Sequence, residues 1–252
     1  MKDGQPEQRN DRPAKPAGFV SPKTVAIYGV LIALTAAVTY SSAAPFSPTK
    51  GYFNLGDSMV FFSALAFGWR AGAICGGVGS ALADILLGFG VFAPVTLTAK
   101  GVEGLVAGGI GTRKYGRVFP IVLAAVAGVF VLVVTSILMY DSGLLDADEP
   151  MPLIVVLIPL LAIIVAAAVY LVFSRGSERV RTWTPIALGV ALGGTCMITI
   201  YFLGEWLLLD VGLGKAILEI PINIAQAVIG GTIGSFLSHR VKKYYPSLSR
   251  GM

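Results

Sequence analysis

The sequence predicts an all-α, polytopic membrane protein, built as a bundle of transmembrane helices. The chain of 252 residues is 55% hydrophobic and only 13% charged, and its mean hydropathy is +0.78. Apolar runs that are long enough to cross a bilayer as helices recur along it, as is typical of integral membrane proteins. A few ionisable residues lie inside these runs, where each is costly unless it faces a polar site within the bundle.

The two ends of the chain are polar and are expected to lie outside the membrane. Residues 1–22 are rich in proline and charge, so they bury too little apolar surface to fold alone, and we expect a disordered cytoplasmic tail. They also lack the apolar core and small-residue cleavage site of a signal peptide. We expect one transmembrane domain over residues 23–240 and a second cytoplasmic tail over residues 241–252.

Eight segments are apolar and long enough to cross the membrane as helices. The second and the fourth are short, so we expect them to be tilted or partly broken. The fifth and the sixth flank an acidic connection. The predicted spans are Thr24–Ala44, Leu55–Trp69, Ala71–Gly88, Pro94–Gly111, Val118–Tyr140, Pro152–Phe173, Thr184–Leu208 and Leu213–Ser238.

Lysine and arginine fall in alternate connections, which predicts the orientation because cytoplasmic loops carry the excess of positive charge. Arg70, Arg113 and Arg175 follow the second, fourth and sixth spans, and a basic segment follows the last. The opposite connections are acidic, most clearly residues 141–149, with Lys50 as the basic exception. Both termini are therefore expected on the cytoplasmic side.

Nearly all polar residues inside the spans fall in the outer half of the membrane in this orientation. Glu219, Asn223 and Gln226 lie at spacings of four and three, so they share one helix face. Small and aliphatic residues fill the inner half. This asymmetry predicts a polar pocket that opens outward, built from Asn54, Asp57, Asp84, Lys100, Glu103, Glu219, Asn223 and Gln226.

Each of these residues also has a purely structural explanation. Asp57 can sit at a helix N-terminus, where the helix dipole favours an acid, and Asp84 can cap a neighbouring backbone. Lys100 and Glu103 are three residues apart and can form a structural ion pair. The amides of the last span can hold helices together by hydrogen bonds. Their convergence on one half of the membrane favours a pocket.

Three strings and part of the last span carry a family resemblance. They are YFNLGD at residues 52–57, AGAICGGVGSALAD at 71–84, KGVEGLVAG at 100–108, and Pro221 with the two amides that follow it. Together they resemble the substrate-binding S components of energy-coupling factor (ECF) transporters, in the riboflavin-type S-component family. The resemblance covers residues 24–112 and, less fully, residues 184–240.

The resemblance implies a core of six helices, so that residues 118–173 would be an inserted pair of spans. In this family the loop after the first helix closes over the ligand, and here that loop is residues 41–54. Its rings, Tyr52 and Phe53, would stack on a flat heterocycle, with anchoring at the membrane interface as the alternative for Tyr52.

The resemblance also implies the partners. The protein would capture a vitamin outside the cell, riboflavin by the family's name, with pyridoxine-like and pyrimidine-like molecules as alternatives. It would then dock on a transmembrane T component driven by two ATP-hydrolysing subunits. An alanine motif on the first helix contacts the T component in this family. That role falls here on Ala33 and Ala37, with ordinary helix packing as the alternative.

The chain itself has no phosphate-binding loop, which agrees with a separate ATPase. No cofactor and no nucleic-acid partner are expected. No metal site is expected either, because the two cysteines have no metal-ligand spacing and the one histidine, His239, sits in the basic tail, where we expect an interfacial residue. An ion-coupled secondary transporter is the main alternative, although the inverted repeats typical of that class are not found. An enzyme is not expected, because the carboxylates fall away from the cytoplasmic surface.

Overall fold

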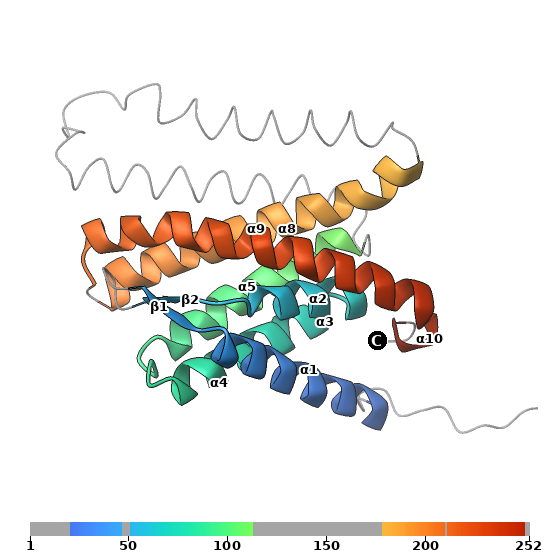
Figure 1. Cartoon of the computed structure of the whole chain (residues 1–252), viewed down its shortest axis with the longest axis horizontal. Coiled ribbons are helices and arrows are strands. Elements are labelled where there is room, and N and C mark those ends of the chain that lie inside the picture. The colour runs from blue at the N-terminus through green and yellow to red at the C-terminus, as the bar shows by residue number, and fades with distance from the viewer. Residues whose placement is uncertain (1–20, 47–50, 113–177, 210, 250–252) are drawn as a thin grey trace, which may run out of the picture.

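The computed structural model describes residues 21–46, 51–112, 178–209 and 211–249, and every structural statement below concerns these residues. They form an all-α membrane bundle to which a short hairpin is added (Figure 1). The elements are α1 (Pro22–Ser41), β1 (Ala44–Phe46), β2 (Gly51–Phe53), α2 (Asp57–Phe67), α3 (Trp69–Ala71), the π-helical η1 (Gly72–Gly76), α4 (Gly77–Leu86), α5 (Ala93–Gly111), α8 (Glu178–Leu203), the π-helical η2 (Gly204–Leu208), α9 (Leu213–Tyr244) and α10 (Pro246–Ser249).

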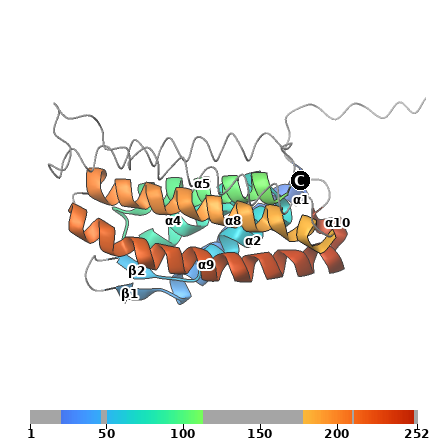
Figure 2. The same cartoon turned by 90° about the horizontal axis from the view of Figure 1, so that it is seen from above.

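The long helices run side by side along one axis (Figure 2). Three of the described helices, Pro22–Ser41, Trp183–Leu208 and Leu213–Tyr244, are long and apolar enough to cross a membrane. The predicted spans within residues 118–173, and residues 1–20 of the predicted tail, lie outside the described part of the chain. α9 continues through His239 to Tyr244, so the first residues of the predicted final tail are helical, and their position outside the membrane stays a prediction.

The first helix ends earlier than the sequence predicted. α1 stops at Ser41 rather than at Ala44, because the next residue uses its hydroxyl to turn the chain. Ser42 Oγ donates to the Val38 carbonyl (2.6 Å) and accepts from the backbone N–H of Leu55 (2.8 Å). One hydroxyl thus joins the end of α1 to the start of α2.

The chain between these helices forms the hairpin that the sequence analysis missed. β1 and β2 pair antiparallel, with Ala44 opposite Phe53 and Phe46 opposite Gly51. Figure 1 shows the hairpin at the end of the bundle where α8 meets α9 and α4 turns into α5. Within the segment that was expected to cover a pocket, the described residues Ala44–Phe46 and Gly51–Phe53 therefore form paired strands at one end of the bundle.

The third predicted span is not one regular helix. α3 passes into five π-helical residues, Gly72–Gly76, before α4 resumes the α-helical pattern. Gly88 (φ 84°) then reverses the chain, with a conformation that L side chains rarely adopt. Isolated π-turns widen a helix locally and are frequent at functional sites.

Small residues bring the helices into backbone contact. A Cβ on Gly104 of α5 would lie 2.3 Å from the carbonyl of Gly72, and one on Gly230 of α9 would lie 2.4 Å from Cβ of Asp57 in α2. Lipid gives no hydrophobic driving force between helices, so van der Waals contact at such points stabilises a membrane bundle. The glycines at these positions therefore allow the helices to pack closely.

We expect Gly104→Ala to destabilise the bundle. The added methyl has no room, and overpacking in a tight interior typically costs about 1–3 kcal/mol. Gly29→Ala is the matched control, because a Cβ there meets nothing within 4 Å. Thermal unfolding of the detergent-solubilised protein should show a lowered midpoint for Gly104→Ala only. Equal midpoints for the two variants would contradict this packing.

Candidate ligand site

A small polar cavity lies at the hairpin end of the bundle. It encloses about 50 Å³, which is room for a few water molecules and far less than the several hundred Å³ of a typical small-molecule site. It is lined by residues of the hairpin and the chain just after it, α4, the α4–α5 turn, α5, α8, η2 and α9. The lining residues are Gly51, Tyr52, Asn54, Asp84, Phe89, Phe92, Thr96, Tyr201, Glu205, Glu219, Asn223 and Gln226.

Two amide side chains on α9, those of Gln226 and Asn223, form hydrogen bonds that hold the chain just after β2. Gln226 Oε1 accepts from the backbone N–H of Asn54 (2.7 Å), and its Nε2 donates to Asn223 Oδ1 (3.1 Å). Asn54 Oδ1 in turn accepts from the backbone N–H of Gly56 (2.8 Å). These amides are all buried, so the network fixes the position of the loop between β2 and α2.

An acid and aromatic rings form a second wall. The Tyr52 hydroxyl donates to Asp84 Oδ1, and burial, followed by the nearby carboxylate, raises the pKa of Tyr52 well above its usual value. The phenol therefore stays protonated and remains a donor. The Tyr52 and Phe89 rings lie 5.1 Å apart, and those of Phe89 and Phe92 lie 6.4 Å apart. Asp84 is thus held beside a continuous aromatic surface.

Two glutamates line the cavity, one from η2 and one from α9. Glu205 lies on the π-helical η2 and is 4% exposed; its Oε2 has no hydrogen-bond partner among the described residues. Glu219 lies on α9, against the hairpin backbone, where a Cβ on Gly51 would come within 2.2 Å of its Oε1. A side chain at position 51 would therefore require the Glu219 carboxylate to shift.

The predicted lysine lies behind the cavity wall rather than on it. Lys100 Nζ bonds to Asp57 Oδ1 and lies 3.4 Å from Glu103 Oε2. Lys100 is 3% exposed, and both carboxylates are fully buried. The ammonium also lies 5.5 Å from the centre of the Tyr201 ring, which does line the cavity. The three residues form a buried ion cluster that supports the wall.

The structure therefore brings six of the ten predicted site residues onto one cavity. They are Tyr52, Asn54, Asp84, Glu219, Asn223 and Gln226. Phe53 is half-buried beside Tyr52 but does not line the cavity, and the ion cluster of Asp57, Lys100 and Glu103 stands behind it. Whether these residues bind a ligand stays a prediction.

Sequence reasoning left several lining residues out. Thr96 and Tyr201 come together across α5 and α8, where the Tyr201 hydroxyl donates to Thr96 Oγ1 (3.1 Å). No local sequence pattern predicts the contact between Thr96 and Tyr201, because they lie on different helices. Phe89 and Phe92 lie in the short connection between α4 and α5, and Glu205 is an acid near the predicted outer end of its span. The acid and these two rings could have been found from their place in the chain.

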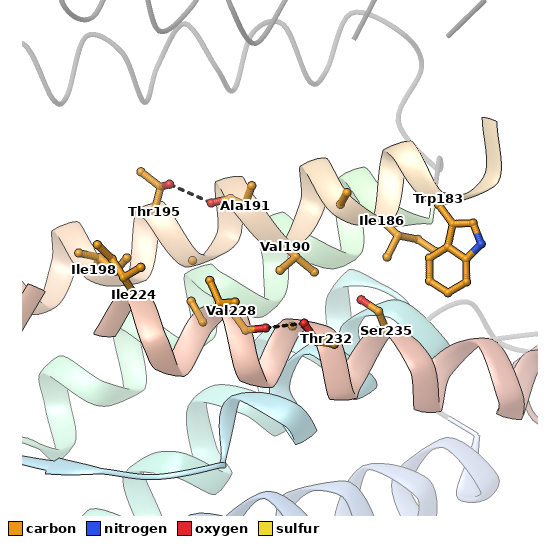
Figure 3. A pocket seen from close by; sticks show the side chains of 14 residues that line it. Trp183, Ile186, Val190, Ala191, Thr195, Ile198, Ile224, Val228, Thr232 and Ser235 are labelled. Atoms are coloured by element: carbon orange, nitrogen blue, oxygen red, sulfur yellow. Dashed lines mark hydrogen bonds between the residues drawn. The ribbon is translucent and has the colours of Figure 1, made fainter. Parts of the chain in front are cut away.

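A second hollow has a different chemistry. An apolar groove of about 460 Å³ runs between α8 and α9, with Trp183 at one end and Ile198 and Ile224 at the other (Figure 3). Its hydroxyls on Thr195 and Thr232 donate to backbone carbonyls of their own helices, four residues earlier. The groove suits contact with acyl chains or an apolar helix and offers little to a polar solute.

The alanines assigned to a partner contact lie on the surface. Ala33 and Ala37 are exposed on α1, and Gly29, one turn before them, has nothing within 4 Å of an added Cβ. The apolar residues Val30 and Leu34 nearby are exposed as well. Within the described residues the small-residue face of α1 is therefore not used for packing inside the bundle.

Comparison with known proteins gives two findings. A family model described as the S component of the ECF-type riboflavin transporter matches residues 19–172, more than half of the chain. The match runs through residues 118–172, which we expected to be an insertion. A Pyrococcus woesei protein described as an "uncharacterized protein in gap 3'region" is 44% identical over 91 residues, or 35% of this chain. The match spans 59% of that relative's length.

Proposed function

The chain belongs to the family of ECF-type riboflavin transporter S components, and we propose that it captures a vitamin-like heterocycle outside the cell for uptake. That family consists of transporter components rather than enzymes. The observation that carries the proposal is the buried cavity of carboxylates, amides and aromatic rings at one end of the membrane bundle. Such a set of convergent polar groups beside stacking surfaces is typical of a small-molecule site.

The proposed orientation places this cavity on the outer side. The start of α1 and α10 lie together at the opposite end of the bundle, where Lys23 Nζ donates to the Ser247 carbonyl (3.3 Å). Figure 1 shows this end, with α10 and the start of α1, far from the hairpin. The basic residues Arg240 and Lys243 precede α10. Positive charge at that end favours a cytoplasmic position for both termini.

Ligand entry requires the hairpin to move, because about 50 Å³ cannot hold a heterocycle. Two hydrogen bonds to residues that line the cavity hold the hairpin and the chain just after it: the Tyr52 hydroxyl donates to Asp84, and the backbone N–H of Asn54 donates to Gln226. A ligand that forms hydrogen bonds with the same lining groups can take the place of the hairpin, so that these buried groups keep partners. We propose that the hairpin opens to admit the ligand and closes over it.

The test is reconstitution in vesicles with the T component and the two ATPases. We expect the purified chain to bind its ligand without ATP, and accumulation to require ATP and the partners. A flavin-like absorbance in the purified protein would identify riboflavin directly. The alternative is an ion-coupled carrier, which the buried cluster of Asp57, Lys100 and Glu103 would suit. Concentrative uptake by this chain alone, driven by an ion gradient, would establish the alternative.

We expect Ala33→Leu and Ala37→Leu to lower ATP-dependent uptake by about tenfold or more while ligand affinity stays within about twofold. Close approach of two membrane helices needs small side chains, and α1 presents these two to the outside of the bundle. Ala225→Leu, an exposed alanine on α9, is the matched control and should leave uptake unchanged. An equal loss of binding and uptake would show a role in folding instead.

A further inference from the structure

We propose that the apolar groove between α8 and α9 binds an anionic phospholipid, with one hydrocarbon chain in the groove and the headgroup at the basic end of α9. This lipid site shares no lining residue with the polar cavity, and it does not depend on the ligand proposed there. The width of the groove, the rings at its end and the charge beyond that end support it separately.

The groove has the dimensions of a single lipid chain. It runs along α8 from Trp183 to Ile198, so it is about 22 Å long at ~1.5 Å per residue (Figure 3). Divided by that length, its volume of about 460 Å³ leaves a cross-section of roughly 20 Å², about 5 Å across, whereas a helix with its side chains is ~10 Å wide. A hydrocarbon chain therefore fits the groove better than a partner helix does.

The floor of the groove is closed, because α8 and α9 already touch there. A Cβ on Gly194 would lie 2.9 Å from Cβ of Ala227, and one on Gly231 would lie 2.2 Å from Cγ1 of Val190. The rim is open within the described residues, where Val228 is 60% exposed. Both helices are long and apolar enough to cross a membrane, so this open, apolar rim faces lipid chains.

Aromatic rings mark the end of the groove at the membrane surface. Trp183 is the first residue of the apolar span of α8, and its ring centre lies 5.2 Å from that of His239, with 32° between the planes. Tryptophan is enriched at the level of the lipid headgroups. On α9, Ser235 of the groove lining, His239 and Lys243 follow one another at spacings of four, so one helix face leads from the groove to the basic end.

The charge beyond this end is positive. Arg240 and Lys243 are exposed, and neither forms an ion pair with a described residue. The first turn of α8, residues 178–181, contains two arginines and one glutamate. Basic pockets between membrane helices on the cytoplasmic side bind anionic headgroups. The acids whose side chains the structure describes belong to the polar cavity or to the ion cluster behind it; they are Asp57, Asp84, Glu103, Glu205 and Glu219.

The test measures which lipid reaches Trp183 in bilayers of stated composition. Trp69→Phe and Trp206→Phe leave Trp183 as the one tryptophan of the full-length chain, and lipids with bromine in the hydrocarbon chain quench its fluorescence. Brominated phosphatidylglycerol and phosphatidylcholine with identical chains differ in headgroup charge. We expect phosphatidylglycerol to bind at Trp183 at least about fivefold more tightly at low salt, and the preference to shrink in high salt, because ions screen it.

Two further changes assign the preference to the groove and its basic end. Val25→Trp with Trp183→Phe, in the same background, moves the reporter to an exposed position near the start of α1, where the two lipids should bind within about twofold of each other. Arg240→Gln together with Lys243→Gln should lower the preference at Trp183 to about twofold or less, because it removes the two exposed cations.

Native mass spectrometry tests the parent chain without any reporter substitution. In mild detergent the parent should retain phosphatidylglycerol at least about fivefold more strongly than phosphatidylcholine. Ala191→Phe puts a ring into the groove and should reduce that retention by about fivefold or more. Ala225→Phe, an exposed change on α9 outside the groove lining, is the matched control and should retain the lipid as the parent does.

Equal affinity of the two lipids at Trp183 and on the parent would show unspecific lipid contact and overturn the inference. A Trp183 that neither lipid quenches would overturn it as well, because a helix or a second copy of the chain would then fill the groove. Ligand binding and ATP-dependent uptake judge the proposed function separately, so the lipid site can fail while the transport role stands.

Discussion

Lys100→Ala is expected to impair folding more than ligand binding. Without the ammonium, Asp57 and Glu103 stay fully buried, side by side and without their counter-ion. Removing one partner from a buried ion pair typically costs about 3–5 kcal/mol, a large part of the stability of most proteins. We expect a low yield of folded protein in detergent and a clearly lowered thermal midpoint.

Neutralising the whole cluster should restore stability. The triple variant Lys100→Met, Asp57→Asn, Glu103→Gln removes all three charges at similar volume, and such replacements are often neutral or stabilising. It should recover most of the midpoint that Lys100→Ala loses. Lys215→Ala, which removes an exposed lysine, is the control and should behave as the parent. If Lys100→Ala alone unfolds at the parent's midpoint, the cluster does not support the bundle.

This expectation differs from the one that the sequence suggested for Lys100. Polar residues inside apolar spans correctly indicated a buried polar region, because an ionisable group in lipid is costly unless it faces polar partners inside the bundle. Their division into lining residues and supporting residues depends on side-chain directions in α2, α4, α5 and α9, which spacing along the chain does not determine. Lys100 and Glu103 share a helix face, as predicted, but that face packs against α2 and Asp57.

For the fold too, the sequence predicted the main elements but not the local details. Hydropathy located the described helices to within a few residues at most ends, because length and apolar content decide what crosses a bilayer. The hairpin was missed because Ala44–Phe46 and Gly51–Phe53 are only three residues each. The π-helical turn at Gly72–Gly76 was missed because hydropathy does not distinguish it from regular α-helix; in the structure it lies in close contact with Gly104 of α5.

Gln226→Leu is expected to loosen the hairpin and weaken ligand binding. The leucine has a similar size but leaves the backbone N–H of Asn54 and the Oδ1 of Asn223 without their partner. Each unpaired buried group costs about 1–3 kcal/mol, so binding should weaken by roughly thirtyfold or more. Hydrogen exchange should report the cause directly, since the Asn54 amide should exchange at least about tenfold faster.

Gln226→Glu tests separately the two hydrogen bonds of Gln226, the one to the Asn54 amide and the one to Asn223 Oδ1. A glutamate keeps an acceptor for the Asn54 amide but cannot donate to Asn223 Oδ1, so exchange at Asn54 should stay close to that of the parent. Phe53, which follows Tyr52 but does not line the cavity, supplies a second control. Phe53→Leu should change affinity much less than Gln226→Leu. If Gln226→Leu binds as the parent does while the Asn54 amide exchanges faster, the hairpin moves freely without affecting the ligand. The cavity beneath it would then not be the binding site.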